Sequence, residues 1–204
     1  MTRIGLPARI FSCLQSYVIL KSMSYANSLT VLRICLVPVL VLLILSGAWK
    51  AALLLFVAAC LSDLLDGWIA RKWRQQSDLG IALDPLADKF LLISVLLVLS
   101  WPGTSDSYWI PIWLTVTVIG RDLLLVLGAA AVYWLRGIHV FPPSFWGKSA
   151  TLFQILSVFL VLVANAGVVN LIPLEPIFLG ALALTLISGL HYLFRASHLA
   201  DFAG

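Results

Sequence analysis

Apolar runs long enough to cross a bilayer recur along the whole chain, and no other feature restricts its fold as strongly. A bilayer core about 30 Å thick needs roughly 20 consecutive apolar residues in a helix that rises about 1.5 Å per residue. Hydrophobic residues make up 62% of the sequence and the mean hydropathy is +1.05. These values exclude an ordinary soluble domain, in which roughly half of the residues are apolar. The sequence therefore predicts an all-α integral membrane protein.

The length of 204 residues suits one domain, and the apolar runs divide into six expected transmembrane helices. These spans are residues 27–45, 51–70, 84–99, 109–135, 147–166 and 171–194. The predicted membrane domain is residues 27–204. Loops on the side of the N-terminus hold most of the Lys and Arg residues, whereas Lys50 is the one basic residue of the opposite loops. The positive-inside rule places the loop at 71–74 in the cytosol, and we expect a bacterial inner membrane.

The N-terminal segment, residues 1–26, mixes basic and apolar residues. Arg3, Arg9 and Lys21 lie among isoleucines, leucines and a phenylalanine. This pattern favours a short helix that lies in the membrane interface. Two alternatives are a signal peptide, whose apolar core Gln15 and several serines would interrupt, and a true start at Met23.

Residues 62–90 hold five of the nine acidic residues of the chain, and four of them form two closely spaced pairs. Asp63 and Asp66 are three residues apart, and Asp84 and Asp88 are four apart, so each pair lies on one face of a helix. Four converging carboxylates cannot all stay ionised near lipid without cations, and oxygen ligands favour magnesium, manganese or calcium. For a single aspartate a helix cap is the simpler interpretation, and Asp84 before Pro85 fits an N-cap followed by the first helical residue.

The spacing of this stretch resembles, position for position, the motif of the CDP-alcohol phosphotransferases. The matching residues are Asp63-x2-Asp66-Gly67-x2-Ala70-Arg71-x8-Gly80-x3-Asp84-x3-Asp88. Members of that family are integral membrane enzymes that transfer a substituted phosphate from a CDP-linked donor to an alcohol. The motif has eight fixed residues, so the resemblance is specific.

The resemblance implies a site for two divalent cations, magnesium or manganese. It implies that Asp63, Asp66 and Asp84 hold one cation. Asp84 and Asp88, with help from Asp63, would hold the other. Asp88 would also take the proton from the attacking hydroxyl, because a carboxylate is a plausible general base for a nearby hydroxyl that a metal activates. No Ser-His-Asp or Cys-His arrangement is present, so we expect direct displacement without a covalent enzyme intermediate.

Five residues are assigned to the CDP-linked donor. Gly67 and Ala70 are small where the donor would lie against the backbone, and Arg71 has the planar fork that suits phosphate oxygens. The alternative for Gly67 and Ala70 is close helix packing through small residues. The resemblance adds Gly80 from the motif and Thr30 from an Asn-x2-Thr-x2-Arg stretch at residues 27–33.

Arg121 and Lys148 are the expected acceptor-binding residues, since charges within membrane spans are usually functional. The alternative for Arg121 is an internal ion pair with a motif carboxylate. Residues 147–154 contain Gly-Lys-x2-Thr-x2-Gln, which resembles phosphatidylglycerophosphate synthases and eukaryotic-type cardiolipin synthases. Those two enzymes transfer from CDP-diacylglycerol, so it is the expected donor.

The expected acceptor is phosphatidylglycerol, which gives cardiolipin, and the alternative is glycerol 3-phosphate. A small dianion needs several cations around it. Arg121-Asp122 is followed by an apolar run in which Ala129 occupies the place where phosphatidylglycerophosphate synthases carry a second arginine. This pattern resembles the cardiolipin synthases.

Two other classes of protein are alternatives, namely a cation or proton transporter and an inactive scaffold of the same fold. Transporters place charges near the midplane of the membrane, whereas these aspartates lie towards helix ends beside a basic loop. The net charge of +4 is scattered and suits anionic lipid better than nucleic acid, so no nucleic-acid partner is expected. A homodimer is expected from the resemblance.

Overall fold

The computed structural model describes residues 35–73, 78–105, 107–136, 145–168 and 173–201, without the side chains of 63–88, 129–136 and 195–201. Within these ranges the chain forms six helices and no strand. They are Cys35–Leu45, α2 (Trp49–Trp73), α3 (Asp78–Leu99), α4 (Ile112–Arg136), α5 (Phe145–Asn165) and α6 (Glu175–Asp201). The predicted all-α class is confirmed, while the predicted interfacial helix at residues 1–26 lies outside the described residues.

Two described helices are long and apolar enough to cross a membrane, namely α5 and the Glu175–Phe194 part of α6. The other apolar stretches found among the described residues are shorter, and one of them is Lys89–Leu99. Six transmembrane helices therefore remain a prediction.

The described helix ends follow the predicted spans within a few residues, except that α6 runs seven residues past the predicted end at 194 and α3 begins six residues early. The third helix was expected to begin near Asp84, but α3 begins at Asp78. The interpretation of Asp84 as an N-cap is therefore wrong, because Asp84 and Pro85 lie inside the helix. Proline lacks the backbone N–H that an internal helical residue donates, yet the helix runs on to Leu99.

Two helices end in the same local geometry, in which a glycine takes a left-handed backbone conformation. Gly47 has φ 72° and follows Cys35–Leu45, and Gly167 has φ 68° and follows α5. At the first end the amide of Gly47 donates to Ile44 O at 3.0 Å and that of Ala48 donates to Leu43 O at 2.9 Å. This hydrogen-bond pattern satisfies carbonyls that the helix leaves open, and glycine adopts it without a Cβ clash. These hydrogen bonds form the turn between Cys35–Leu45 and α2.

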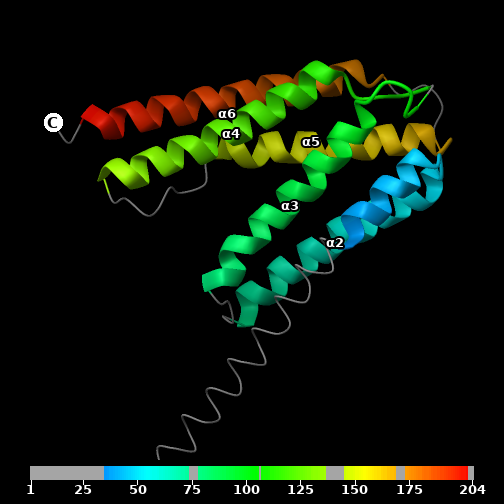
Figure 1. Cartoon of the computed structure of the whole chain (residues 1–204), viewed down its shortest axis with the longest axis horizontal. Helices are drawn as coiled ribbons and strands as arrows, with labels where there is room; N and C mark the ends of the chain where they lie inside the picture. The colour runs from blue at the N-terminus through cyan, green and yellow to red at the C-terminus, as the bar shows by residue number, and fades with distance from the viewer. Residues whose placement is uncertain (1–34, 74–77, 106, 137–144, 169–172, 202–204) are drawn as a thin grey trace, which may run out of the picture.

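The helices pack into one bundle, in which α5 contacts α2, α3 and α6, and α4 contacts α3 and α6. Figure 1 shows α4, α5 and α6 running side by side, with α2 and α3 set obliquely against them. Every one of these helices contributes to a shared core, represented by the fully buried Phe56, Leu96, Val118, Val158 and Ala181. The burial of these apolar side chains stabilises the arrangement that carries the site.

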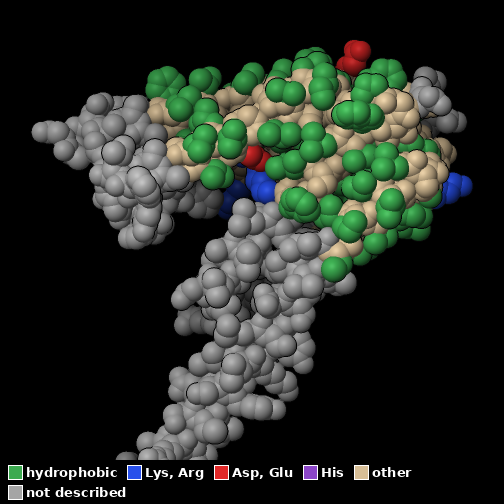
Figure 2. All heavy atoms as spheres, viewed as in Figure 1, with side chains coloured by type: hydrophobic (Ala, Val, Ile, Leu, Met, Phe, Trp, Pro, Cys, Tyr) green, Lys and Arg blue, Asp and Glu red, His purple; other side chains and the backbone are tan. Residues whose placement is uncertain are grey.

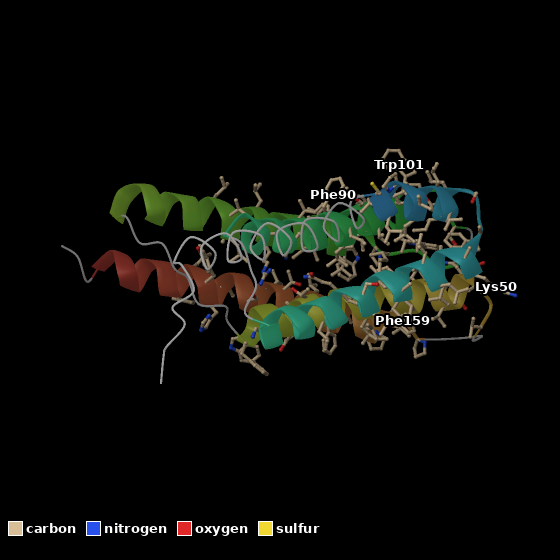
Figure 3. All side chains as sticks on the ribbon, turned by 90° about the horizontal axis from the view of Figure 1, so that it is seen from below. Lys50, Phe90, Trp101 and Phe159 are labelled. Carbon is tan, nitrogen blue, oxygen red and sulfur yellow. The ribbon has the colours of Figure 1, made fainter. Side chains whose placement is uncertain are left out.

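The outer surface is apolar as well. Figure 2 shows hydrophobic side chains across the described face, with few charges among them. Leu54 is 72% exposed, and Figure 3 shows Phe90 and Trp101 projecting outward while Lys50 lies at one end of the bundle. Exposed apolar surface of this extent is unusual for a soluble monomer and suits contact with lipid.

Candidate functional site

The motif residues lie on two consecutive helices, around the connection between them. The last three turns of α2 contain Asp63, Asp66, Gly67, Ala70 and Arg71. The first three turns of α3 contain Gly80, Asp84 and Asp88. Figure 1 shows the end of α2 and the start of α3 at the same end of the molecule. The structure thus places the two carboxylate pairs on helices that meet at a short connection.

The two carboxylate pairs occupy matching heights along their own helices. Asp63 lies ten residues before the end of α2 at Trp73, and Asp88 lies ten residues after the start of α3 at Asp78. Each distance corresponds to about 15 Å of helix. By the same measure, Asp66 lies about 10 Å from the end of α2, and Asp84 lies about 9 Å from the start of α3. Each helix therefore carries its carboxylate pair at a similar distance from the connection.

This donor set fits the divalent cations that the resemblance implies. Four carboxylates offer hard oxygen atoms, which magnesium and manganese prefer, and their four charges balance two such ions. The side chains of all four aspartates lie outside the described residues. Among the side chains that are described, no group of three or more His, Cys, Asp or Glu residues is placed to hold a metal.

A polar network links α3, α4 and α6 directly beside the motif. Lys89 follows Asp88, and its Nζ donates to Asp122 Oδ2 of α4 at 2.5 Å. Arg121 NH1 donates to Asp122 Oδ1 at 2.7 Å, and Arg121 NH2 donates to Ser188 Oγ of α6 at 2.6 Å. Figure 2 shows acidic and basic side chains meeting amid the hydrophobic ones. The network joins α3, α4 and α6 around the carboxylate of Asp122.

Arg121 is the most deeply buried charge in this network. The residue is only 9% exposed, and its Nε has no hydrogen-bond partner among the described residues. The alternative predicted for Arg121 was an ion pair with a motif carboxylate. Its described ion pair is instead with the adjacent Asp122, which lies outside the motif. A buried cation with an unused donor is costly unless an anion satisfies it.

The other predicted acceptor residue, Lys148, is placed differently. It lies in the first turn of α5, its side chain is exposed, and it makes no ion pair with a described residue. No described contact brings Lys148 and Arg121 together. Farther along the same stretch, Gln154 is fully buried and donates from Nε2 to Thr185 Oγ1 at 3.1 Å. That hydrogen bond joins α5 to α6, which gives part of the Gly-Lys-x2-Thr-x2-Gln stretch a packing role.

Sequence reasoning missed Lys89 and Ser188. Lys89 stands next to a motif aspartate, and this position was the available signal. Ser188 is a small polar residue within an apolar run, and such residues often only bond their own helix. Its proximity to Arg121 depends on the packing of α4 against α6. Thr30, the predicted donor residue of the first span, lies outside the described residues.

An apolar groove of about 510 Å³ opens between α4 and α6. It is lined by Gly120, Leu123, Leu124, Leu127, Gly128, Tyr192 and Leu193. Gly128 brings the two helices close, since a Cβ added there would lie 2.9 Å from Cε1 of Tyr192. Gly120 precedes Arg121 in the chain, and Tyr192 follows Ser188 by about one helical turn. The groove therefore lies along the same pair of helices, α4 and α6, that carries Arg121 and Ser188.

Known proteins resemble the chain over most of its length. The sequence profile of CDP-alcohol phosphatidyltransferase matches residues 23–188. A Mycobacterium tuberculosis protein named "Probable phosphatidylglycerophosphate synthase" is 35% identical over 186 residues, which are 88% of this chain and 83% of that protein. The Streptomyces coelicolor cardiolipin synthase (CMP-forming) is 36% identical over 69% of this chain and 65% of its own. The human cardiolipin synthase (CMP-forming) is 48% identical over 54% of this chain and 34% of its own.

An all-helical bundle with an apolar surface and two membrane-length helices suggests a membrane location, and the sequence profile gives the class, a phosphatidyltransferase. The chain belongs to the CDP-alcohol phosphatidyltransferase family. It is thus an enzyme of phospholipid synthesis, and members of its family generally depend on divalent cations. The family implies CDP-diacylglycerol as donor and a glycerol-type acceptor. The match does not support the transporter or scaffold alternatives.

Proposed function

We propose that this transferase moves the phosphatidyl group of CDP-diacylglycerol to the free hydroxyl of phosphatidylglycerol, giving cardiolipin and CMP. The supporting observation is the charge of the described residues around Arg121. Lys89 and Arg121 carry two positive charges and Asp122 carries one negative charge, so the net charge is +1. Phosphatidylglycerol is a monoanion that this charge balances, whereas glycerol 3-phosphate is a dianion that calls for more cations.

The groove between α4 and α6 also favours a lipid acceptor. Its lining is apolar, it is open to the surface that suits lipid, and it lies on the two helices that carry Arg121 and Ser188. A phospholipid needs an apolar path for its chains beside a polar place for its phosphate, because burying a polar group in an apolar path without a partner is costly. A soluble acceptor would have no use for such a path.

The proposed chemistry is a direct displacement at the phosphorus on the lipid side of the pyrophosphate. Asp88 accepts the proton of the acceptor hydroxyl as that oxygen attacks, and CMP leaves. Asp63, Asp66, Asp84 and Asp88 would hold two divalent cations, magnesium or manganese. When bound, such ions neutralise charge on the non-bridging and leaving oxygens.

The donor site would adjoin the same two helices. Arg71 donates hydrogen bonds to the donor's phosphate oxygens, since its fork fits them. Gly67 and Ala70 leave room for the cytidine and phosphates against the backbone of α2, and Gly80 and Thr30 complete the set. Lys148 is the second proposed acceptor residue, and because its side chain is exposed in the first turn of α5 it is not part of the charge counted around the buried Arg121.

The proposed arrangement in the cell has residues 27–204 crossing a bacterial inner membrane six times, with residues 1–26 at the interface and the active site facing the cytosol. We also propose a homodimer. Cysteine labelling at Lys72 should occur from the cytosolic side, and labelling at Ser105 from the opposite side. The reverse pattern would contradict the orientation.

Phosphatidylglycerophosphate synthesis is the second candidate. It is favoured by the M. tuberculosis protein of that printed name, which is similar over 88% of this chain. The human and Streptomyces proteins named cardiolipin synthase favour the first candidate. The charge near Arg121 and the apolar groove support the lipid acceptor over the soluble one.

Direct competition tests the acceptor. Purified protein receives CDP-diacylglycerol, magnesium and equal amounts of phosphatidylglycerol and glycerol 3-phosphate, and the lipid products are separated. Cardiolipin is the expected main product. Phosphatidylglycerophosphate as the dominant product, with no cardiolipin formed, would overturn the proposed acceptor while leaving the transferase class intact.

A further inference from the structure

Ser188 makes a different kind of hydrogen bond from Ser157, another buried serine of the bundle. Ser157 on α5 is fully buried and donates to Phe153 O of its own helix at 2.8 Å. Ser188 on α6 is 1% exposed, and its described hydrogen bond runs to another helix, from Arg121 NH2 to Ser188 Oγ at 2.6 Å. A hydroxyl that bonds its own backbone affects one helix, whereas one that bonds a buried guanidinium determines where that group lies.

The guanidinium of Arg121 is held at two of its three nitrogen atoms. Asp122 accepts from NH1 at 2.7 Å, and Ser188 accepts from NH2 at 2.6 Å. The stem also lies close to α6, because a Cβ added to Gly189 would be 3.7 Å from Arg121 Cγ. Two hydrogen bonds at different nitrogens fix the orientation of a planar group as well as its position. The remaining nitrogen, Nε, then has a defined direction.

The Nε of this guanidinium is the one of its nitrogen atoms without a partner among the described residues. The Lys89–Asp122–Arg121 set has one more positive than negative charge. Asp122 already accepts on both oxygen atoms, Oδ2 from Lys89 and Oδ1 from Arg121. A buried, oriented and unsatisfied N–H beside a surplus positive charge suits one oxygen of a monoanionic phosphate.

We propose that Ser188 is a positioning residue for the acceptor, because it orients Arg121 so that Nε binds the phosphate of a monoanionic phospholipid. This inference rests on the proposed function, which gives Arg121 to the acceptor. Ser188 itself acts through Arg121. Its loss leaves the charge of Arg121 in place but frees the guanidinium to rotate, so acceptor binding weakens while the motif chemistry is unaffected.

The test compares Ser188→Ala with Ser188→Thr, which keeps a hydroxyl. Ser188→Ala should raise KM for phosphatidylglycerol about tenfold, the size expected for one hydrogen bond to a charged group. The KM for CDP-diacylglycerol and kcat should stay near those of the unmodified protein. Ser188→Thr should recover most of the acceptor affinity. The matched control is Ser157→Ala, the same change at equal burial, which should leave the acceptor KM unchanged.

A double variant keeps the test valid if Ser188→Ala lowers stability. Arg121→Lys retains the charge but lacks the fork that Ser188 holds, so Ser188→Ala added to it should raise the acceptor KM no further. An unchanged acceptor KM in Ser188→Ala would overturn the inference. An equal rise of the acceptor KM in Ser157→Ala would overturn it too. So would a further tenfold rise of that KM when Ser188→Ala is added to Arg121→Lys.

The two proposals fail in different ways. If Arg121→Lys alone leaves the acceptor KM unchanged, Arg121 does not bind the acceptor and its assignment in the proposed function is wrong. If Arg121→Lys raises that KM while Ser188→Ala does not, Arg121 keeps its role and only the positioning by Ser188 is wrong.

Discussion

The two polar regions of this protein are built in opposite ways. The region around the α2–α3 connection places eight motif residues within 26 consecutive positions, from Asp63 to Asp88, so their spacing is a property of two helices. The network of Lys89, Asp122, Arg121 and Ser188 draws on three helices, and Arg121 and Ser188 are 67 residues apart. The first region is assembled by local structure and the second by packing. We therefore expect the first to govern whether the reaction occurs and the second to govern which acceptor is used.

The largest expected effect is in the motif. Asp88→Asn removes the proposed general base and should lower kcat about 100-fold or more, while donor binding largely persists. Asp63→Ala removes a shared ligand charge and should lose metal binding together with activity. Glu175→Gln, a change at an exposed carboxylate at the start of α6, is the control and should leave turnover unchanged. Near-normal turnover in Asp88→Asn would show that Asp88 is not the general base.

Metal removal is a second way to separate the regions. A chelator should abolish turnover, and added magnesium or manganese should restore it, because four carboxylates without cations repel one another. The measurement is CMP release before and after the metal is returned. Full turnover in metal-free buffer would contradict a metal site at the motif. It would not bear on the proposed role of the Arg121 network in acceptor binding.

Breaking the network at its shared carboxylate should have a smaller effect on turnover and a clear effect on stability. Asp122→Ala leaves Lys89 and the buried Arg121 without their common partner. The loss of one partner of a buried ion pair costs about 3 kcal/mol, so the melting temperature should fall. Lys89→Met is the comparison, because Lys89 is 33% exposed and its loss leaves Asp122 paired with Arg121. An equal fall in melting temperature in both variants would mean that the burial of Arg121 does not determine the loss of stability.

The smallest expected effect concerns the groove. Gly128→Ala places a Cβ 2.9 Å from Cε1 of Tyr192, so the ring must shift, and we expect a loss of about 1 kcal/mol together with slower use of phosphatidylglycerol. Gly120→Ala is the matched control on the same helix and the same groove, since a Cβ there meets nothing within 4 Å. Thermal unfolding and acceptor kinetics measure the difference. Identical behaviour of the two variants would show that close contact at Gly128 is unimportant.

Much of the fold and the family could be predicted from local signals. The apolar runs predicted the described helices, and most of their ends lie within a few residues of the predicted spans. At Asp84-Pro85 a local cap signal gave the wrong start for α3. A favourable cap contributes only about 1 kcal/mol, and a longer helix packed against α4 and α5 outweighs it.

The sequence by itself determined the helical class, the spacing of the motif aspartates and the family, because each depends on residues close together in the chain. Only the tertiary structure decided that Arg121 is buried, that it pairs with Asp122 and reaches Ser188, and that Lys148 is exposed. The physical reason is that helix spacing follows from local backbone geometry, whereas contacts between α4 and α6 depend on how side chains of distant helices fit together. No spacing rule along the chain could place Ser188 beside Arg121.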